Sequence, residues 1–140
     1  MDEVSGIAAV RGFYDAIGDR PYEETVSPFL HEQIVWHVAG SNPLAGTFYG
    51  IPAVLAAMRS FASASNGSLR LDTRTLLGDD SHVVAIHAAT ATLGEHEYAA
   101  HEVDVFHVAG GRITEFWSFS EDQVATDRLW ALGAGTSPAS

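Results

Sequence analysis

His37 is the residue whose neighbours in the sequence best fit proton-transfer chemistry. It stands in a run of β-branched and aromatic residues, Ile34 to Val38, which favours a strand. The turn sequence Gly40-Ser41-Asn42-Pro43 follows at once, and further glycines continue to Gly50. A neutral imidazole held on a strand beside such a loop can take a proton from a carbon acid or from water. A histidine hydrogen-bonded in the core has the same pattern, so both interpretations stay open.

The remaining histidines do not predict a metal centre. The chain has seven histidines but neither a His-Glu-x-x-His motif nor a His-x-His pair. His101 and His107 share a face of one predicted strand, yet six residues of strand separate them by roughly 20 Å. No glycine-rich phosphate loop is present, so a nucleotide cofactor is not expected either. We therefore expect no metal and no cofactor.

Composition limits the classes of partner. The 140 residues include 18 acidic and 7 basic side chains, which give a formal net charge of −11. Nucleic-acid binding and adsorption to an anionic membrane surface both need a basic footprint, so neither is expected. The chain has no cysteine, and its acidic N-terminus does not resemble a signal peptide. These features predict a soluble cytoplasmic protein.

The hydrophobic pattern changes from helical to strand periodicity along the chain. It predicts helices over Asp2–Ile17, Tyr22–Phe29 (after Pro21), from Pro52 onward, and Glu121–Leu132. It predicts strands near Ile34–Val38 and over Leu69–Thr75, His82–Leu93, Glu97–Val108 and Arg112–Ser120.

Helices first and a meander of strands later indicate an α+β fold. We expect a curved antiparallel sheet wrapped as a cone around the N-terminal helices, with an interior pocket. Residues 1–132 are predicted to form one domain and 133–140 a flexible C-terminal tail.

Two stretches resemble a known family. VWHVAGSNPLAGTFYG at residues 35–50 and EVDVFHVAGGRITEFWSFSEDQ at residues 102–123 are similar to the SnoaL-like branch of the nuclear transport factor 2-like superfamily. The resemblance covers Val4 to Leu132. The superfamily includes isomerases, cyclases, hydrolases, dehydratases and non-enzymatic binders, so it implies the fold more strongly than the reaction.

Ketosteroid isomerase, a member of that superfamily, implies where catalytic groups stand. Its general base aligns with His37 and its second acid with Asp104. Its oxyanion tyrosine aligns with Phe13, and Tyr14 is adjacent. In SnoaL-like cyclases an acid follows a strand tryptophan, and here that position is Ser118. The chain departs from both patterns, so neither reaction is carried over intact.

Strand alternation then predicts the rest of the pocket. If Asp104 points inward, its strand also turns Glu102 and Phe106 inward. The predicted substrate contacts, besides the catalytic pair His37 and Asp104, are Tyr14, Trp36, Glu102, Phe106, Thr114, Phe116 and Ser118. A mostly apolar lining with a few polar groups is typical of a small-molecule cavity.

These expectations lead to a cofactor-independent acid–base enzyme of the isomerase, cyclase or hydratase/dehydratase type. Its substrate would be a hydrophobic, oxygenated small molecule. The alternatives are a non-catalytic ligand-binding protein and a dimeric accessory protein of the same fold. By the family resemblance we also expect a homodimer formed through the sheet face.

Overall fold

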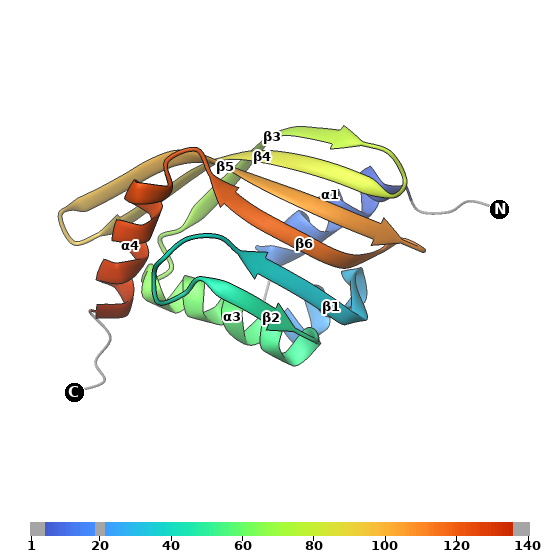
Figure 1. Ribbon diagram of the computed structural model, residues 1–140, viewed down its shortest axis with the longest axis horizontal. Coiled ribbons are helices and arrows are strands. Elements are labelled where there is room, and N and C mark those ends of the chain that lie inside the picture. Colours follow the sequence, from blue (N-terminus) through green and yellow to red (C-terminus); the bar gives the residue numbers. More distant parts are fainter. Residues whose placement is uncertain (1–4, 19–21, 136–140) are drawn as a thin grey trace.

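The computed structural model describes residues 5–18 and 22–135 of the chain. The predicted helix start at Asp2, the proline at position 21 and the end of the predicted tail lie outside these residues. The fold is α+β, as predicted, with a curved, unclosed sheet of six strands (Figure 1). In spatial order the strands are β2, β1, β6, β5, β4 and β3.

The strands follow the predicted meander with one addition. Their bounds are β1 Leu30–Val38, β2 Gly46–Tyr49, β3 Arg70–Gly78, β4 His82–Leu93, β5 His96–Ala109 and β6 Arg112–Ser120. Neighbouring strands are antiparallel except β1 and β6, which run parallel. The short strand β2 was expected to be loop. It forms because Thr47, Phe48 and Tyr49 pair with the strand that precedes the turn.

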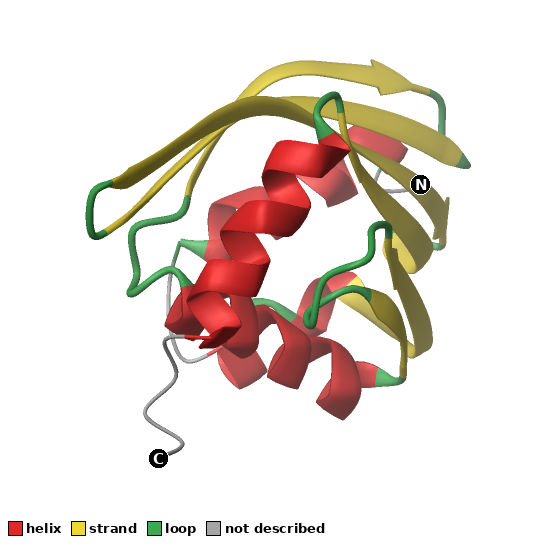
Figure 2. Ribbon diagram, turned by 60° about the vertical axis from the view of Figure 1, so that its left-hand side comes forward, coloured by secondary structure: helices red, strands yellow, loops and turns green. Residues whose placement is uncertain are grey.

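The helices cover the concave side of the sheet (Figure 2). Their bounds are α1 Gly6–Ile17, α2 Tyr22–Thr25, the short 3₁₀ helix η1 Ser27–Phe29, α3 Ile51–Ala64 and α4 Gln123–Gly135. The second predicted helix is therefore two short pieces, because Pro28 interrupts the hydrogen-bonding pattern. Helix α4 also includes residues 133–135, which were expected to belong to the tail.

The core lies between α1, α3 and the concave face. Helix α1 begins at an N-cap, where the Ser5 side chain accepts a hydrogen bond from the Ala8 amide at 3.0 Å. It buries Val10 and Phe13 against the sheet. Phe106 of β5 is completely buried and stacks on Phe116 of β6, with ring centroids 5.1 Å apart. These contacts hold α1 across the middle of the sheet, where its C-terminal half reaches the polar residues described below.

Within the described residues, no helix is long and apolar enough to cross a membrane.

The β3–β4 hairpin depends on a glycine with no space for a side chain. Gly78 has φ +150°, and a Cβ there would lie 2.1 Å from the His82 carbonyl oxygen. Gly46 has a similar φ of +144° but open space around it. We expect Gly46→Ala to lower the free energy of unfolding by about 1 kcal/mol, from backbone strain alone. Gly78→Ala should cost roughly 3 kcal/mol, because the backbone of His82 must also move.

Urea unfolding of the two variants measures the difference, and Gly46→Ala is the matched control for φ. Equal losses in the two variants would contradict the close approach at Gly78.

Candidate functional site

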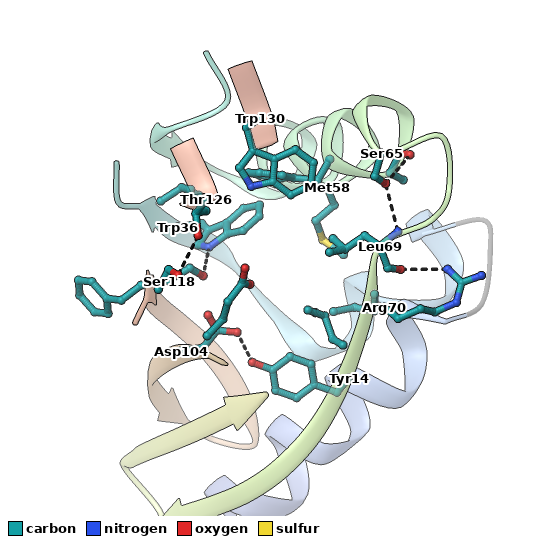
Figure 3. Close-up of a pocket in the computed structure, with 18 of the residues that line it drawn as sticks. Tyr14, Trp36, Met58, Ser65, Leu69, Arg70, Asp104, Ser118, Thr126 and Trp130 are labelled. Atoms are coloured by element: carbon teal, nitrogen blue, oxygen red, sulfur yellow. Dashed lines mark hydrogen bonds between the residues drawn. The ribbon is translucent and has the colours of Figure 1, made fainter. Parts of the chain in front are cut away.

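A cavity of about 750 Å³ lies between the concave face of the sheet and the helices. Most of its wall is apolar and includes Met58, Leu69 and a group of contacting rings, Trp36, Phe61 and Trp130. Figure 3 shows Tyr14 and Asp104 on one side of the open centre, with Trp36, Met58 and Trp130 facing them from the others. The volume and the lining are those of a site for a drug-sized molecule.

Asp104 is the central polar group of the cavity. The residue is 8% exposed, and its Oδ2 accepts hydrogen bonds from the Tyr14 hydroxyl and from Nε2 of His87, the latter at 3.1 Å. Its Oδ1 makes no hydrogen bond with a described residue. No buried side-chain oxygen among the described residues is left without a partner, so Oδ1 is not sealed off. One oxygen of Asp104 is therefore fixed by the protein, and the other is available to the cavity.

His87 lies behind Asp104 and does not line the cavity. The residue is 1% exposed, and its Nδ1 lies 3.1 Å from the Thr73 hydroxyl. Nε2–H therefore donates to Asp104, and Nδ1 shares a hydrogen bond with the Thr73 hydroxyl. The Tyr14 ring packs edge-on against His87, with centroids 4.4 Å apart. Burial and the Asp104 carboxylate raise the pKa of Tyr14 well above its usual value, so Tyr14 stays a hydrogen-bond donor.

Glu102 is the second carboxyl group of the cavity and stands two residues before Asp104 on β5. Burial raises its pKa to about 7; the Asp104 charge adds to the rise, whereas the Tyr98 hydrogen bond and His87 oppose it. The Tyr98 hydroxyl donates to Glu102 Oε2 at 2.7 Å. Such a carboxyl group gains and loses a proton near neutral pH, as a general acid or base must.

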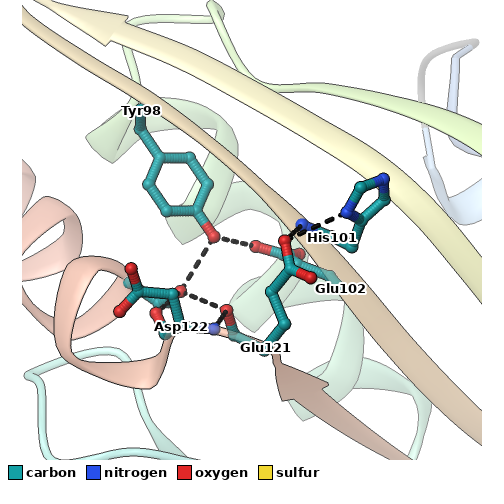
Figure 4. A network of polar contacts seen from close by, with 7 residues as sticks. Tyr98, His101, Glu102, Glu121 and Asp122 are labelled. Carbon is teal, nitrogen blue, oxygen red and sulfur yellow. Dashed lines mark hydrogen bonds and ion pairs between the residues drawn. The ribbon is translucent and has the colours of Figure 1, made fainter.

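Tyr98 connects Glu102 to the start of α4 (Figure 4). Its hydroxyl lies 2.8 Å from that of Thr126, which lies 2.7 Å from the hydroxyl of Ser120. Burial raises the pKa of Tyr98 above its usual value, with a further contribution from the Glu102 charge. The network thus fixes the Glu102 side chain from behind and leaves its free oxygen to the cavity.

The aromatic wall has its own polar contact. Trp36 stacks on Phe116, with centroids 5.2 Å apart, and its indole N–H donates to Ser118 Oγ at 2.9 Å. Since Ser118 accepts this bond, its own O–H is free to donate to a ligand.

The turn after β1 closes one side of the cavity. Asp127 of α4 accepts from the Ser41 amide at 3.2 Å, the Asn42 amide group at 2.8 Å and the Gln123 amide group at 3.0 Å. Gly40 has φ +120°, a backbone conformation that favours glycine, and a Cβ there would lie 2.3 Å from the Asp127 carboxylate and displace it. The turn and α4 are therefore joined beside the cavity, with Asn42 and Gln123 in its wall.

The structure brings most of the predicted site residues together. The cavity lining includes Tyr14, Trp36, Glu102, Asp104, Phe116 and Ser118.

The expectation that His37 shares this cavity is wrong. Its Nε2 lies 2.6 Å from Glu115 Oε2 and its ring stacks on Trp117, both on the opposite face of the sheet. The parallel pairing of β1 with β6 explains the difference. It places Trp36 beside Phe116 and His37 beside Trp117, so only one of the two neighbours can point inward. The larger apolar ring, Trp36, takes the buried position.

Phe106 and Thr114 also lie outside the cavity lining. Phe106 points inward as predicted, but Phe116 and Phe13 cover its ring, so it belongs to the core. At Thr114 the pairing of β5 with β6 shifts by one residue, and the Thr114 hydroxyl donates to the His107 carbonyl at 3.3 Å. Such a bulge interrupts the alternation on which the prediction relied.

His87 is the site residue that the sequence analysis missed. The signal was present in β4, where Val83, Ala85, Ala89, Ala91 and Leu93 are buried at alternate positions and His87 occupies the same series. The small alanines beside it leave the space that the polar groups occupy. In the described part of the chain, no three side chains of the metal-binding types gather closely enough to hold an ion.

Comparisons with known proteins show the family and the fold of the chain. Residues 10–116 match the SnoaL-like domain family. The uncharacterised protein Rv0034 of Mycobacterium tuberculosis is 33% identical over 95 residues, which are 67% of this chain and 72% of that protein. The structure of Bal32a, from a soil-derived mobile gene cassette, has a TM-score of 0.83 at 27% identity and covers 92% of this chain and 99% of its own. An NTF2-like protein from Burkholderia xenovorans has a TM-score of 0.77 at 20% identity, covering 93% and 98%.

The raised pKa of Glu102 predicts a pH-dependent stability. The folded protein holds the Glu102 proton up to about pH 7, whereas an unfolded glutamate loses it near 4.5. The folded state therefore binds more protons between these values, and stability falls as the pH rises through them. Between pH 5 and pH 8.5 we expect the wild type to lose about 2 kcal/mol more than Glu102→Gln does.

Urea unfolding at the two pH values measures this loss, with Glu97→Gln, an exposed carboxylate on the same strand, as the control. If Glu102→Gln kept the full pH dependence of the wild type, Glu102 would not hold its proton in the folded protein.

Proposed function

Because the chain belongs to the SnoaL-like family, we propose that its cavity is the active site of a small acid–base enzyme. The enzyme converts a largely hydrophobic, oxygenated small molecule with side chains of this chain alone. The observation that carries the proposal is the pair of carboxyl groups on β5, Asp104 and Glu102, which face one ligand-sized cavity in different environments. Two carboxyl groups whose surroundings differ in this way divide into a base and an acid.

Asp104 is the proposed base. The hydrogen bonds from Tyr14 and His87 hold its Oδ2, so Oδ1 meets the substrate in one orientation. Tyr14 and His87 act through Asp104 and are positioning residues.

Glu102 is the proposed acid. At neutral pH it is partly protonated, and it faces the same cavity as Asp104. A carbon-bound proton of the substrate would move to Asp104 Oδ1, and the Glu102 proton would move to an oxygen or carbon of the substrate. The Ser118 hydroxyl and the Trp36 ring would orient the molecule.

This exchange of two protons suits isomerisation, cyclisation, and addition or loss of water. A proton returns to Glu102, and one leaves Asp104, by exchange with solvent, so the cycle needs no oxidant or reductant. The second candidate is a binding protein that uses the same cavity without chemistry. The mostly apolar wall would favour tight binding of a hydrophobic ligand in either case.

Substitution of Asp104 separates the two candidates. Once a converted substrate is found, we expect Asp104→Asn to lower kcat by roughly 1000-fold, because general-base catalysis contributes on the order of 100- to 10,000-fold. Ligand affinity should change much less. Tyr14→Phe should lower kcat by roughly tenfold, since one of two hydrogen bonds to Asp104 remains.

His37→Ala is the control, because His37 lies on the opposite face of the sheet. Full turnover by Asp104→Asn would refute the proposal that Asp104 is the base of an enzyme. If His37→Ala lost turnover and Asp104→Asn did not, the reaction would have to take place on the opposite face of the sheet.

We also propose that two copies pair through the convex face of the sheet. The strand registers place a row of side chains across all six strands, which we call the outer row: Leu77, Val84, Val105, Trp117, His37 and Thr47. Leu77 is 60% exposed, and Tyr49 beside the row is 71% exposed.

The distribution of charge favours a second copy of the chain on this face. The chain carries a net charge of −11, so two copies repel each other over most of their surface. The outer row has no carboxylate, and the neighbouring Glu115 is paired with His37. Two copies can therefore meet along the outer row without placing unpaired carboxylates of that row against each other.

Sedimentation tests the pairing. At micromolar concentration we expect the wild type to sediment at twice the 14.9 kDa chain mass. Val105→Glu should sediment as a single chain, because it places like charges opposite each other in a twofold contact. Ala56→Glu, exposed on α3 on the helical side, is the control and should behave as the wild type. A monomeric wild type, or a dimer unaffected by Val105→Glu, would contradict the proposal.

A further inference from the structure

We infer that the ligand of the cavity carries a positive charge: it is a hydrophobic molecule with a protonated amine, which lies against Asp104 and Glu102. The inference deepens the proposed function and rests on it only in taking this cavity as the working site. Three features support it: the two carboxyl groups of the wall, the aromatic rings of the same wall, and the free-energy cost of removing water from carboxylates when a ligand binds.

No lysine or arginine among the described residues of the lining stands beside the two carboxyl groups. Among the described residues of the lining, Arg70 is the only lysine or arginine. It is exposed, and its guanidinium donates to the carbonyl oxygens of Gly67 at 2.7 Å and Leu69 at 3.0 Å, at the edge of the cavity. Figure 3 shows Arg70 turned away from the open centre, while Asp104 stands on the other side.

A ligand that fills the cavity removes the water that solvates these carboxylates. A buried ionised carboxylate is costly unless it is paired. Tyr14 and His87 satisfy Oδ2 of Asp104 and Tyr98 satisfies Oε2 of Glu102, but the outer oxygens rely on what enters the cavity. An ammonium group supplies both the charge and up to three N–H donors. An anionic ligand would add repulsion to the same cost.

The aromatic wall supports the same class of ligand. Trp36, Phe61, Phe116 and Trp130 line the cavity together with Tyr14 and Tyr22. Aromatic faces attract organic cations, most strongly when water is excluded, and they also pack on the hydrophobic body of the ligand. Carboxylates and rings in one cavity thus suit a cation that also has an apolar part.

Glu102 makes the preference depend on pH. The groups that face it are Tyr98 and Asp104 of β5, His87 of β4, and Tyr14 of α1. None is a lysine or arginine, so an ammonium group, which then replaces Glu102 as the acid of the proposed reaction, would favour the ionised form of Glu102. Binding of an amine should therefore release a proton, and its affinity should increase between pH 6 and pH 8, up to about tenfold for a group with a pKa near 7.

Three probes of matched size and different charge test the inference: 2-naphthylmethylamine, 2-naphthylmethanol and 2-naphthoate. Calorimetry at pH 6 and pH 8 gives their affinities for the wild type, Glu102→Gln and Asp104→Asn. Glu115→Gln is the control, because Glu115 lies on the opposite face with His37. We expect the amine to bind at least tenfold more tightly than the alcohol at pH 8, and the naphthoate most weakly.

In Glu102→Gln the increase of amine affinity with pH should disappear, and in Asp104→Asn the advantage over the alcohol should fall about tenfold. Glu115→Gln should match the wild type. Equal binding of amine and alcohol, tighter binding of naphthoate, or an amine preference unchanged in both cavity variants would overturn the inference while leaving the cavity as a ligand site. Failure of all three probes to bind at millimolar concentration would instead count against the cavity itself, and so against the proposed function.

Discussion

The candidate site depends on one buried carboxylate, that of Asp104, which joins three elements of the fold. It accepts from Tyr14 of α1 and from His87 of β4 while standing on β5. A buried carboxylate is tolerated only where donors satisfy it, so the position of α1 and the identity of residue 87 are tied to residue 104. The C-terminal half of α1 thus both covers the core, through Phe13, and supplies the hydroxyl that the site needs.

The sheet separates two sets of groups with different tasks. Its concave face presents Asp104, Glu102, Ser118 and the stacked rings to the cavity, and its convex face presents the outer row. Adjacent residues on one strand therefore serve different sides: Trp36 and His37 on β1, and Phe116 and Trp117 on β6. A substitution that shifted the β1–β6 register by one residue would exchange these sets, which is why the parallel pairing matters to the site as much as the catalytic groups.

The sequence predicted the α+β class, five of the six strands and six residues of the cavity wall, because those features follow from periodicity and from the family resemblance. It misplaced His37, because a motif counted back from a turn does not tell which neighbouring strand will set the inward face. It missed His87, because the histidines were considered as metal ligands rather than as members of an alternating strand. Thr114 was misjudged because a bulge depends on the partner strand, which the local sequence does not show.

The proposed acid and base roles require that a second carboxyl group beside Asp104 exchange its proton near neutral pH inside the cavity. The most direct measurement is a carbon-13 NMR titration that follows the side-chain carboxyl carbon of Glu102 in the folded protein from pH 4 to pH 9. A midpoint near pH 7 is the result predicted by the buried position of Glu102. A midpoint near 4.5, the usual value for a glutamate, would mean that water solvates this carboxyl group freely, and it would contradict the division of acid and base roles in the cavity.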